Sequence, residues 1–149
     1  MTDVVVTRLG LDASSALSLL LAAHVQEVRG GEPPRPDRYY SEKLLSSPGI
    51  RLFGATIGDE LIGFAVVHEL EDCLSGLEAG LLETVFVRHD RRGRGAGRAL
   101  LEAVSSEGRR RAWSGLRWIV DDRVSHSTLP ERLARPAGTR ALVVPITRQ

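Results

Sequence analysis

The feature that most constrains the fold is a strand-like run, a glycine-rich turn and a helix-like run that follow one another. The run Leu81–Val87 (LLETVFV) is rich in β-branched and aromatic residues, which favours a strand. The run Gly95–Ala112 carries Leu100, Leu101 and Val104 on one face at helical spacing. Gly93 and four arginines lie between the two runs, and two further glycines, Gly95 and Gly97, open the second run. This order predicts an α/β unit whose strand enters a helix through a basic, flexible turn.

The rest of the chain adds further strands and helices to this unit. Runs at residues 3–10, 50–57, 61–70, 116–120 and 140–146 predict strands, and runs after residue 12 and at residues 37–47 and 125–134 predict helices. Pro130 fits only the first turn of the last helix, and Pro145 favours an edge position for the last strand. The order β-α-α-β-β-β-α-β-α-β predicts one mixed α/β domain over residues 1–149, built around a central sheet.

Charge and cysteine content exclude several classes of protein. The formal net charge of the 149 residues is +1, so the chain is no general polyanion binder, and its basic residues cluster locally. The single cysteine, Cys73, allows no internal disulfide and no thiolate cluster for a metal, so we expect no metal site. The sequence shows neither a membrane-spanning run nor a signal peptide, and we expect a cytoplasmic protein with no membrane partner. Arginine-rich, lysine-poor usage is typical of a GC-rich bacterial genome.

The turn Arg92–Arg98 (RGRGAGR) allows two interpretations, a basic surface turn or a cradle for a phosphorylated ligand. At a strand-to-helix junction the first helical N–H groups lack intrahelical partners, and glycines let a ligand approach the backbone. The lysine and the Ser/Thr of a nucleotide-hydrolysing phosphate loop are missing, and the glycine spacing does not fit a dinucleotide-binding turn. A pyrophosphate is the ligand that suits this turn best.

The turn resembles the coenzyme A motif of the GCN5-related N-acetyltransferase (GNAT) superfamily, Gln/Arg-x-x-Gly-x-Gly/Ala. Arg92, Gly95 and Gly97 occupy its three fixed places, Val87 ends the preceding strand at the usual distance, and Gly97–Leu101 (GRALL) continues into the helix. The order of elements matches the superfamily from residue 4 to residue 146.

The resemblance implies a GNAT-type fold, with a mixed central sheet splayed between its fourth and fifth strands and flanked by helices. Acetyl-CoA would lie in that opening, with its pyrophosphate on the turn and its pantetheine arm paired with the backbone of the fourth strand. The residues implied for this cofactor site are Val85, Phe86, Val87, Arg92, Gly93, Arg94, Gly95, Ala96, Gly97 and Arg98.

Acetyl transfer to an amine requires a neutral nucleophile. A lysine-like amine is only about one part in 2,500 neutral at pH 7, so a general base lowers the barrier. Glu83 is our candidate base, since it matches a glutamate of several superfamily members that act on small amines. Regular strand alternation predicts that Glu83 points to the same side as Val87. The alternatives are an electrostatic anchor for a cationic substrate and an ordinary solvated glutamate.

The chain departs from the superfamily where many members place a tyrosine that protonates the leaving thiolate. The region RVSHSTLPERLARPAG (residues 123–138) contains no tyrosine, and Pro130 falls at or beside its position. Tyr40, Tyr39 and His126 are possible replacements, of which we choose Tyr40 as a catalytic residue. Otherwise the thiolate leaves unassisted, or the chain is a non-catalytic acyl-CoA-binding regulatory module.

The predicted function is therefore acetyl-CoA-dependent N-acetylation of a small primary amine by direct transfer. The acidic segment 68–80 (HELEDCLSGLEAG) would favour a cationic acceptor if it rims the cleft, but an ordinary solvated hairpin is an equal alternative. Nucleic acid is not expected, because aromatic residues do not alternate with the arginines of residues 88–111. A homodimer through the strand at residues 140–146 is possible.

Overall fold

The computed structural model describes residues 3–121, 123 and 129–146 of the chain. In chain order the elements are β1 (Val4–Arg8), the 3-10 turn η1 (Leu11–Ala13), α1 (Ser14–Arg29), α2 (Arg38–Ser46), β2 (Ile50–Ile57), β3 (Glu60–Asp72), β4 (Leu77–Val87), the 3-10 turn η2 (His89–Arg91), α3 (Ala96–Arg110), β5 (Leu116–Trp118) and α4 (Leu129–Leu133). No helix in this part of the chain is both long enough and apolar enough to cross a membrane.

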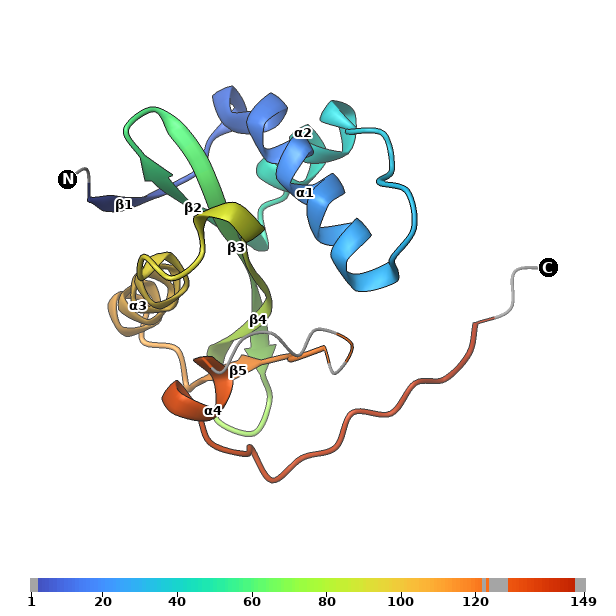
Figure 1. Ribbon diagram of the computed structural model, residues 1–149. Helices are drawn as coiled ribbons and strands as arrows, with labels where there is room; N and C mark the ends of the chain where they lie inside the picture. Colours follow the sequence, from blue (N-terminus) through green and yellow to red (C-terminus); the bar gives the residue numbers. More distant parts are fainter. Residues whose placement is uncertain (1–2, 122, 124–128, 147–149) are drawn as a thin grey trace.

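The strands form one mixed sheet in the order β1-β2-β3-β4-β5. The first four strands are antiparallel neighbours, and β5 runs parallel to β4. Helices α1 and α2 cover one face of the sheet, and α3 covers the other (Figure 1). The mixed α/β fold expected from the sequence is thus confirmed.

Two apolar clusters hold these layers together, one on each face of the sheet. On the α3 face, Leu82, Leu100 and Val104 are fully buried. On the face of α1 and α2, Leu17 and Phe64 are fully buried among further apolar side chains. Each cluster combines helix residues at 3–4 spacing with strand residues at alternate positions, so both periodicities seen in the sequence are satisfied.

The sheet opens between β4 and β5. Residues Gly80–Leu82 of β4 pair with Leu116–Trp118, and the N–H of Ile119 still donates to the carbonyl of Leu82 at 2.9 Å. Beyond Leu82, β4 continues to Val87 without a strand on its β5 side in the described chain. The splay between the fourth and fifth strands is the one expected from the family resemblance.

The expectation of a last strand at residues 140–146 is wrong. These residues form no strand and run away from the sheet as an exposed, extended segment (Figure 1). A strand requires a partner for its N–H and C=O groups, and a local sequence pattern does not supply one. The preceding helix is short, and Pro130 lies in its first turn as expected.

Candidate functional site

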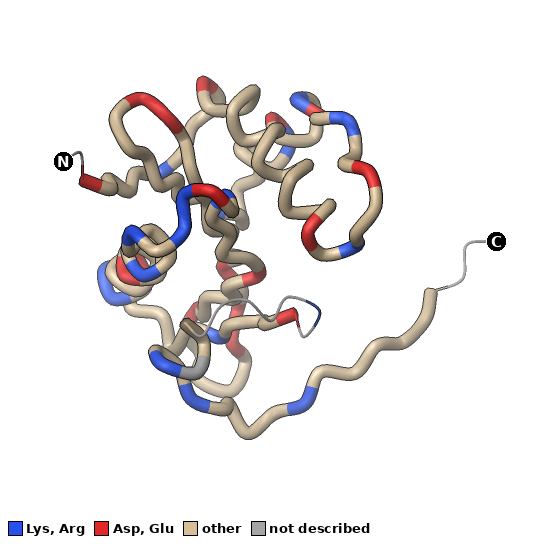
Figure 2. The backbone as a smooth tube through the Cα atoms, in the orientation of Figure 1, with Lys and Arg blue, Asp and Glu red and all other residues tan. Residues whose placement is uncertain are grey.

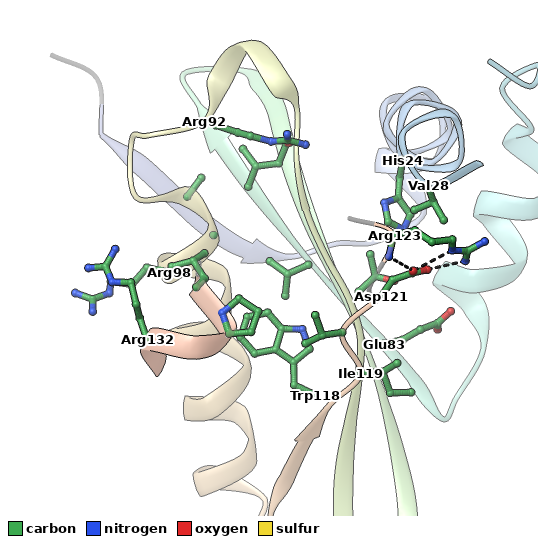
Figure 3. Close-up of a pocket in the computed structure, with 18 of the residues that line it drawn as sticks. His24, Val28, Glu83, Arg92, Arg98, Trp118, Ile119, Asp121, Arg123 and Arg132 are labelled. Atoms are coloured by element: carbon green, nitrogen blue, oxygen red, sulfur yellow. Dashed lines mark hydrogen bonds and ion pairs between the residues drawn. The ribbon is translucent and has the colours of Figure 1, made fainter. Parts of the chain in front are cut away.

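A cavity of about 920 Å³ occupies the opening between β4 and β5 (Figure 3). Its walls come from the end of α1, the second half of β4, the turn before α3, the residues that follow β5 and the start of α4. The glycine-rich turn lies at one end, and Glu83, His24 and Asp121 lie toward the other. The cavity therefore joins the glycine-rich turn to a group of ionisable side chains.

The glycine-rich turn leaves the start of α3 accessible to a ligand. Gly93 and Gly95 have φ angles of 80° and 83°, which other residues rarely adopt, and a Cβ atom at either position would meet no protein atom within 4 Å. The first intrahelical bond runs from the N–H of Ala99 to the carbonyl of Gly95 at 3.0 Å. The amides of residues 96–98 thus lack intrahelical acceptors and lie beside the cavity, where they fit the phosphates of a coenzyme.

Arg92 fastens this turn to the rest of the fold. Its Nε donates to the carbonyl of Val87 at 2.8 Å, and its Nη2 lies 2.5 Å from the Glu27 carboxylate on α1. The guanidinium also lies over the Phe86 ring, 5.7 Å from its centroid. Arg92 therefore positions the end of β4, the turn and α1 relative to one another.

The remaining residues predicted for the cofactor site lie in different surroundings. Val85 and Val87 line the cavity on the part of β4 that has no strand on its β5 side among the described residues. The Phe86 side chain is buried on the opposite face, among the core residues below α1. Arg98 lines the cavity together with Arg132, a cation from α4 that the sequence analysis did not select. Arg94 is exposed and is not part of the cavity wall.

Glu83 occupies a β-bulge. Val66 pairs with Thr84 and Val67 pairs with Leu82, so Glu83 is the extra residue on β4. Its carboxylate lies 2.6 Å from Nε2 of His68. His68 pairs with Ile50, which packs into the core on the α1 face.

The expectation that Glu83 points to the same side as Val87 is therefore wrong. Val87 packs on the α3 face, whereas Glu83 lies on the α1 face with His68. The expectation assumed an unbroken alternation, and the extra residue shifts that alternation by one position. The shift turns the carboxylate toward the α1 side of the cavity, and its side chain remains 53% exposed.

Two further ionisable residues line this end of the cavity. His24 on α1 contacts the rings of Phe86 and Phe64, at centroid distances of 5.2 Å and 6.1 Å, and its burial lowers the pKa of the imidazole below the ordinary value of 6.5. The Arg123 guanidinium lies 2.6 Å from the Asp121 carboxylate and lowers its pKa to about 2. At neutral pH the cavity thus presents a neutral imidazole and an ionised carboxylate.

Sequence reasoning missed His24 and Asp121 for identifiable reasons. His24 occupies a position in the apolar repeat of α1, and this pattern predicts a core residue rather than a site residue. Asp121 follows a strand pattern without any motif, so its only signal is its place after a strand.

The proposed acid Tyr40 lies on α2 with 48% of its surface exposed, and neither Tyr40 nor Tyr39 lines the cavity. A catalytic role for Tyr40 stays a prediction that this placement does not support. His126 lies outside the described residues.

The acidic segment 68–80 does not rim the cavity, apart from the contact that His68 makes with Glu83. Arg111 and the Trp113 indole N–H both bind the Glu69 carboxylate, and the Arg111 guanidinium strongly lowers the pKa of that carboxyl. The Ser114 hydroxyl donates to Asp72 at 2.7 Å. These contacts join the β3–β4 hairpin to the segment after α3, so most of the acidic residues serve the fold. The described residues contain no group of three or more His, Cys, Asp or Glu side chains that could hold a metal ion.

Comparison with known proteins agrees with this geometry. The family model for the acetyltransferase (GNAT) family matches residues 17–128. A ribosomal-protein-alanine N-acetyltransferase from Brucella melitensis biovar Abortus 2308 is 29% identical, with a TM-score of 0.85 over 96% of this chain and 99% of that one. Comparison with curated proteins found no match.

More distant solved structures share the fold. An aminoglycoside acetyltransferase from an uncultured soil metagenomic sample, in complex with sisomicin, is 18% identical, with a TM-score of 0.76 over 98% of this chain and 96% of that one. An aminoglycoside N-acetyltransferase, AAC(6')-Iy, in complex with CoA, is 18% identical, with a TM-score of 0.75 over 100% of this chain and 97% of that one. The fold is that of these acetyltransferases. The chain belongs to the acetyltransferase (GNAT) family.

Proposed function

We propose that the protein is an acetyl-CoA-dependent N-acetyltransferase that acetylates the primary amine of a small, cationic acceptor by direct transfer. One observation carries the proposal: a single cavity runs from the open amides at the start of α3 to the Glu83 carboxylate. An acetyl-CoA molecule held along that cavity would bring its thioester from the phosphate end toward the ionisable end.

The turn and β4 would hold the donor. The free amides of residues 96–98 would receive the pyrophosphate, and the side chains of Arg98 and Arg132 would add positive charge. The backbone of Val85 and Val87 faces an opening with no strand in the described chain, so it can pair with the amides of an extended pantetheine arm. When bound, acetyl-CoA supplies the activated acetyl group.

The ionisable end would hold and activate the acceptor. The ionised Asp121 carboxylate, together with the Glu83 carboxylate, attracts an ammonium group. Glu83, directly or through one water molecule, accepts a proton from that ammonium, and the neutral amine attacks the thioester carbonyl. The carbon–nitrogen bond forms as the carbon–sulfur bond breaks. The acetylated nitrogen then releases its extra proton to solvent, and the leaving thiolate takes a proton from solvent. The placement of Tyr40 outside the cavity favours this unassisted departure.

The α-amine of a polypeptide is a second candidate acceptor. It is favoured by the 29% identity, over nearly the whole of both chains, with a protein described as a ribosomal-protein-alanine N-acetyltransferase. An α-amine has a reference pKa of about 7.7–8.0, so it depends less on a general base than a lysine-like amine does.

Thiol release from acetyl-CoA across a panel of amines tests the proposal. The panel holds an aminoglycoside, a polyamine, free amino acids and a short peptide that begins with alanine. Release that requires one of the cationic small amines supports the proposal, and release only with the peptide supports the second candidate. CoA binding without release on any amine would indicate the non-catalytic acyl-CoA-binding module instead.

A further inference from the structure

His24 is an ionisable residue of the cavity to which the proposed reaction assigns no step. It lies on α1 and lines the cavity together with Glu83 and Asp121. Figure 3 shows the imidazole pointing from α1 toward Asp121. Its ring also packs against Phe64 and Phe86. The imidazole is therefore held in one place by aromatic side chains, while it borders the space in which the reaction would occur.

The contact with Phe86 places His24 beside the part of β4 that would hold the pantetheine arm. The two ring centroids are 5.2 Å apart, and Phe86 lies between Val85 and Val87 on the strand. The Phe86 and Glu83 side chains both lie on the α1 face of the sheet. A coenzyme with its phosphates on the turn runs along β4 from Val87 toward Glu83, so its thioester would reach the space that His24 and Glu83 border.

Burial keeps the imidazole neutral. It is the largest influence on His24, and it lowers the pKa of the imidazole below the ordinary value of 6.5. At neutral pH the ring therefore carries one N–H group and one nitrogen with a lone pair. A neutral imidazole of this kind can accept a proton from a reacting group.

Charged groups from several sides of the cavity also act on the imidazole. The nearby carboxylates raise its pKa, and the Arg92 guanidinium lowers it. Acidic positions lie on the last part of α1, along β4 and after β5 (Figure 2). These carboxylates stabilise the imidazolium once a proton has arrived. The groups are Glu27 on α1, Glu83 on β4, which is bound by His68 of β3, Asp121 after β5, which is paired with Arg123, and Arg92 of the turn.

Acetyl transfer provides a task for such a residue. The ammonium form of a primary amine loses two protons when its nitrogen becomes an amide nitrogen, and the leaving thiolate gains one. Glu83 accepts the first proton in the proposed mechanism. The second proton leaves the nitrogen after the carbon–nitrogen bond has formed, when the sulfur needs a proton. One residue beside both atoms can carry that proton from the nitrogen to the sulfur.

We propose that His24 carries this second proton from the acceptor nitrogen to the leaving sulfur, an inference that rests on the proposed acetyl transfer. The neutral ring takes the proton from the positively charged nitrogen that results from attack on the thioester. The imidazolium then donates it to the sulfur as the carbon–sulfur bond breaks, which gives the free thiol and restores the neutral ring. An imidazolium with a pKa below 6.5 is a stronger acid than a thiol with a reference pKa of about 8.5, so this donation is favourable.

This route replaces both proton exchanges with solvent. The proton that Glu83 accepts is the only one that passes to solvent, and it accounts for the one proton that the overall reaction releases. His24 thereby takes the place of the tyrosine that residues 123–138 lack.

Steady-state thiol release with the best amine of the panel tests the assignment in two variants, His24→Gln and His24→Ala. Each should lower kcat by about 10²-fold or more, with little change in the KM of the amine, because a proton carrier acts in the chemical step. Circular dichroism and the affinity for CoA should change little. His89→Gln, which removes an exposed histidine outside the cavity wall, is the matched control and should keep the wild-type kcat. An unchanged kcat, or a loss confined to KM, would overturn the proposal.

Chemical rescue separates proton transfer from packing. His24→Ala leaves a space of the size of the ring, and added imidazole should restore thiol release until that space is filled. Pyrazole has the same ring size and is a far weaker base, so it should restore little. Equal rescue by both compounds, or rescue by neither, would show that the ring matters for packing alone and would contradict the proposal.

The wild type distinguishes this inference from the proposed function. If the wild type releases thiol with an amine and both His24 variants behave like it, the proton transfer by His24 is wrong and the acetyl transfer stands. If the wild type binds CoA but releases thiol with no amine of the panel, the proposed function is wrong, and the role of His24 is wrong with it.

Discussion

The Glu83 carboxylate on β4 lies 2.6 Å from Nε2 of His68 on β3. The contact occurs at the β-bulge that turns Glu83 toward the α1 side of the cavity. Because His68 is part of a regular antiparallel pair with β2, its imidazole provides a fixed partner for a carboxylate that is half exposed. Glu83 is thus held by a neighbouring strand at the end of the cavity away from the glycine-rich turn.

If Glu83 is the general base, Glu83→Gln should lower kcat by about 10²–10⁴-fold, the usual contribution of such a group. Part of the lost kcat should be recovered at high pH, because the neutral amine becomes abundant there. The measurement is steady-state thiol release with the best amine of the panel, and Glu102→Gln, at an exposed position on α3, is the matched control. A change in KM alone would identify Glu83 as an electrostatic anchor.

His68→Leu should lower kcat by less than Glu83→Gln does, because it removes the partner that orients the carboxylate and leaves the carboxylate itself. In the double variant the two effects should not add, since His68 acts through Glu83. A double-mutant cycle on kcat checks this. Fully additive losses would show that His68 acts independently of Glu83.

Gly95→Val should abolish CoA binding. The φ angle of 83° at Gly95 is strained for a β-branched residue, at a cost of about 1–3 kcal/mol. The strain would be relieved by moving the amides that we propose bind phosphate. Calorimetric titration with CoA, together with the melting temperature, separates lost binding from lost folding. Gly115→Ala is the control, because a Cβ there also meets open space but the φ angle is not in the left-handed region. Unchanged affinity in Gly95→Val would remove the turn from the binding site.

We expect the folded protein to lose stability in mild acid because of His24. Burial lowers the pKa of His24 in the folded state below 6.5, so the unfolded chain binds this proton more readily. The contribution of the neutral His24 side chain to the free energy of unfolding is therefore complete above about pH 6.5. It is lost as the pH falls through the folded-state pKa. Denaturant unfolding at a series of pH values should show a shallower acid loss for His24→Gln than for the wild type. His89→Gln, which removes an exposed histidine, serves as the control, and parallel curves for the wild type and His24→Gln would contradict the prediction.

The order and type of most elements could be predicted from the sequence, and so could the turn before α3. Hydrophobic periodicity is a local property, as is the glycine requirement of a turn with positive φ angles at Gly93 and Gly95. The family resemblance rested on the same short segment. These features depend on residues that are neighbours in the sequence, so the sequence alone was enough to predict them.

The tertiary structure decided where the ionisable residues point. The bulge at Glu83 arises from the register between β3 and β4, and no local pattern in LLETVFV indicates an extra residue. His24 and Asp121 line one cavity although they are 97 positions apart in the sequence, because α1 and the segment after β5 border the same opening. The segment 140–146 has the composition of a strand but finds no partner in its own sheet. Strand pairing and cavity formation join residues far apart in the chain, so their outcome depends on the packing of the whole fold.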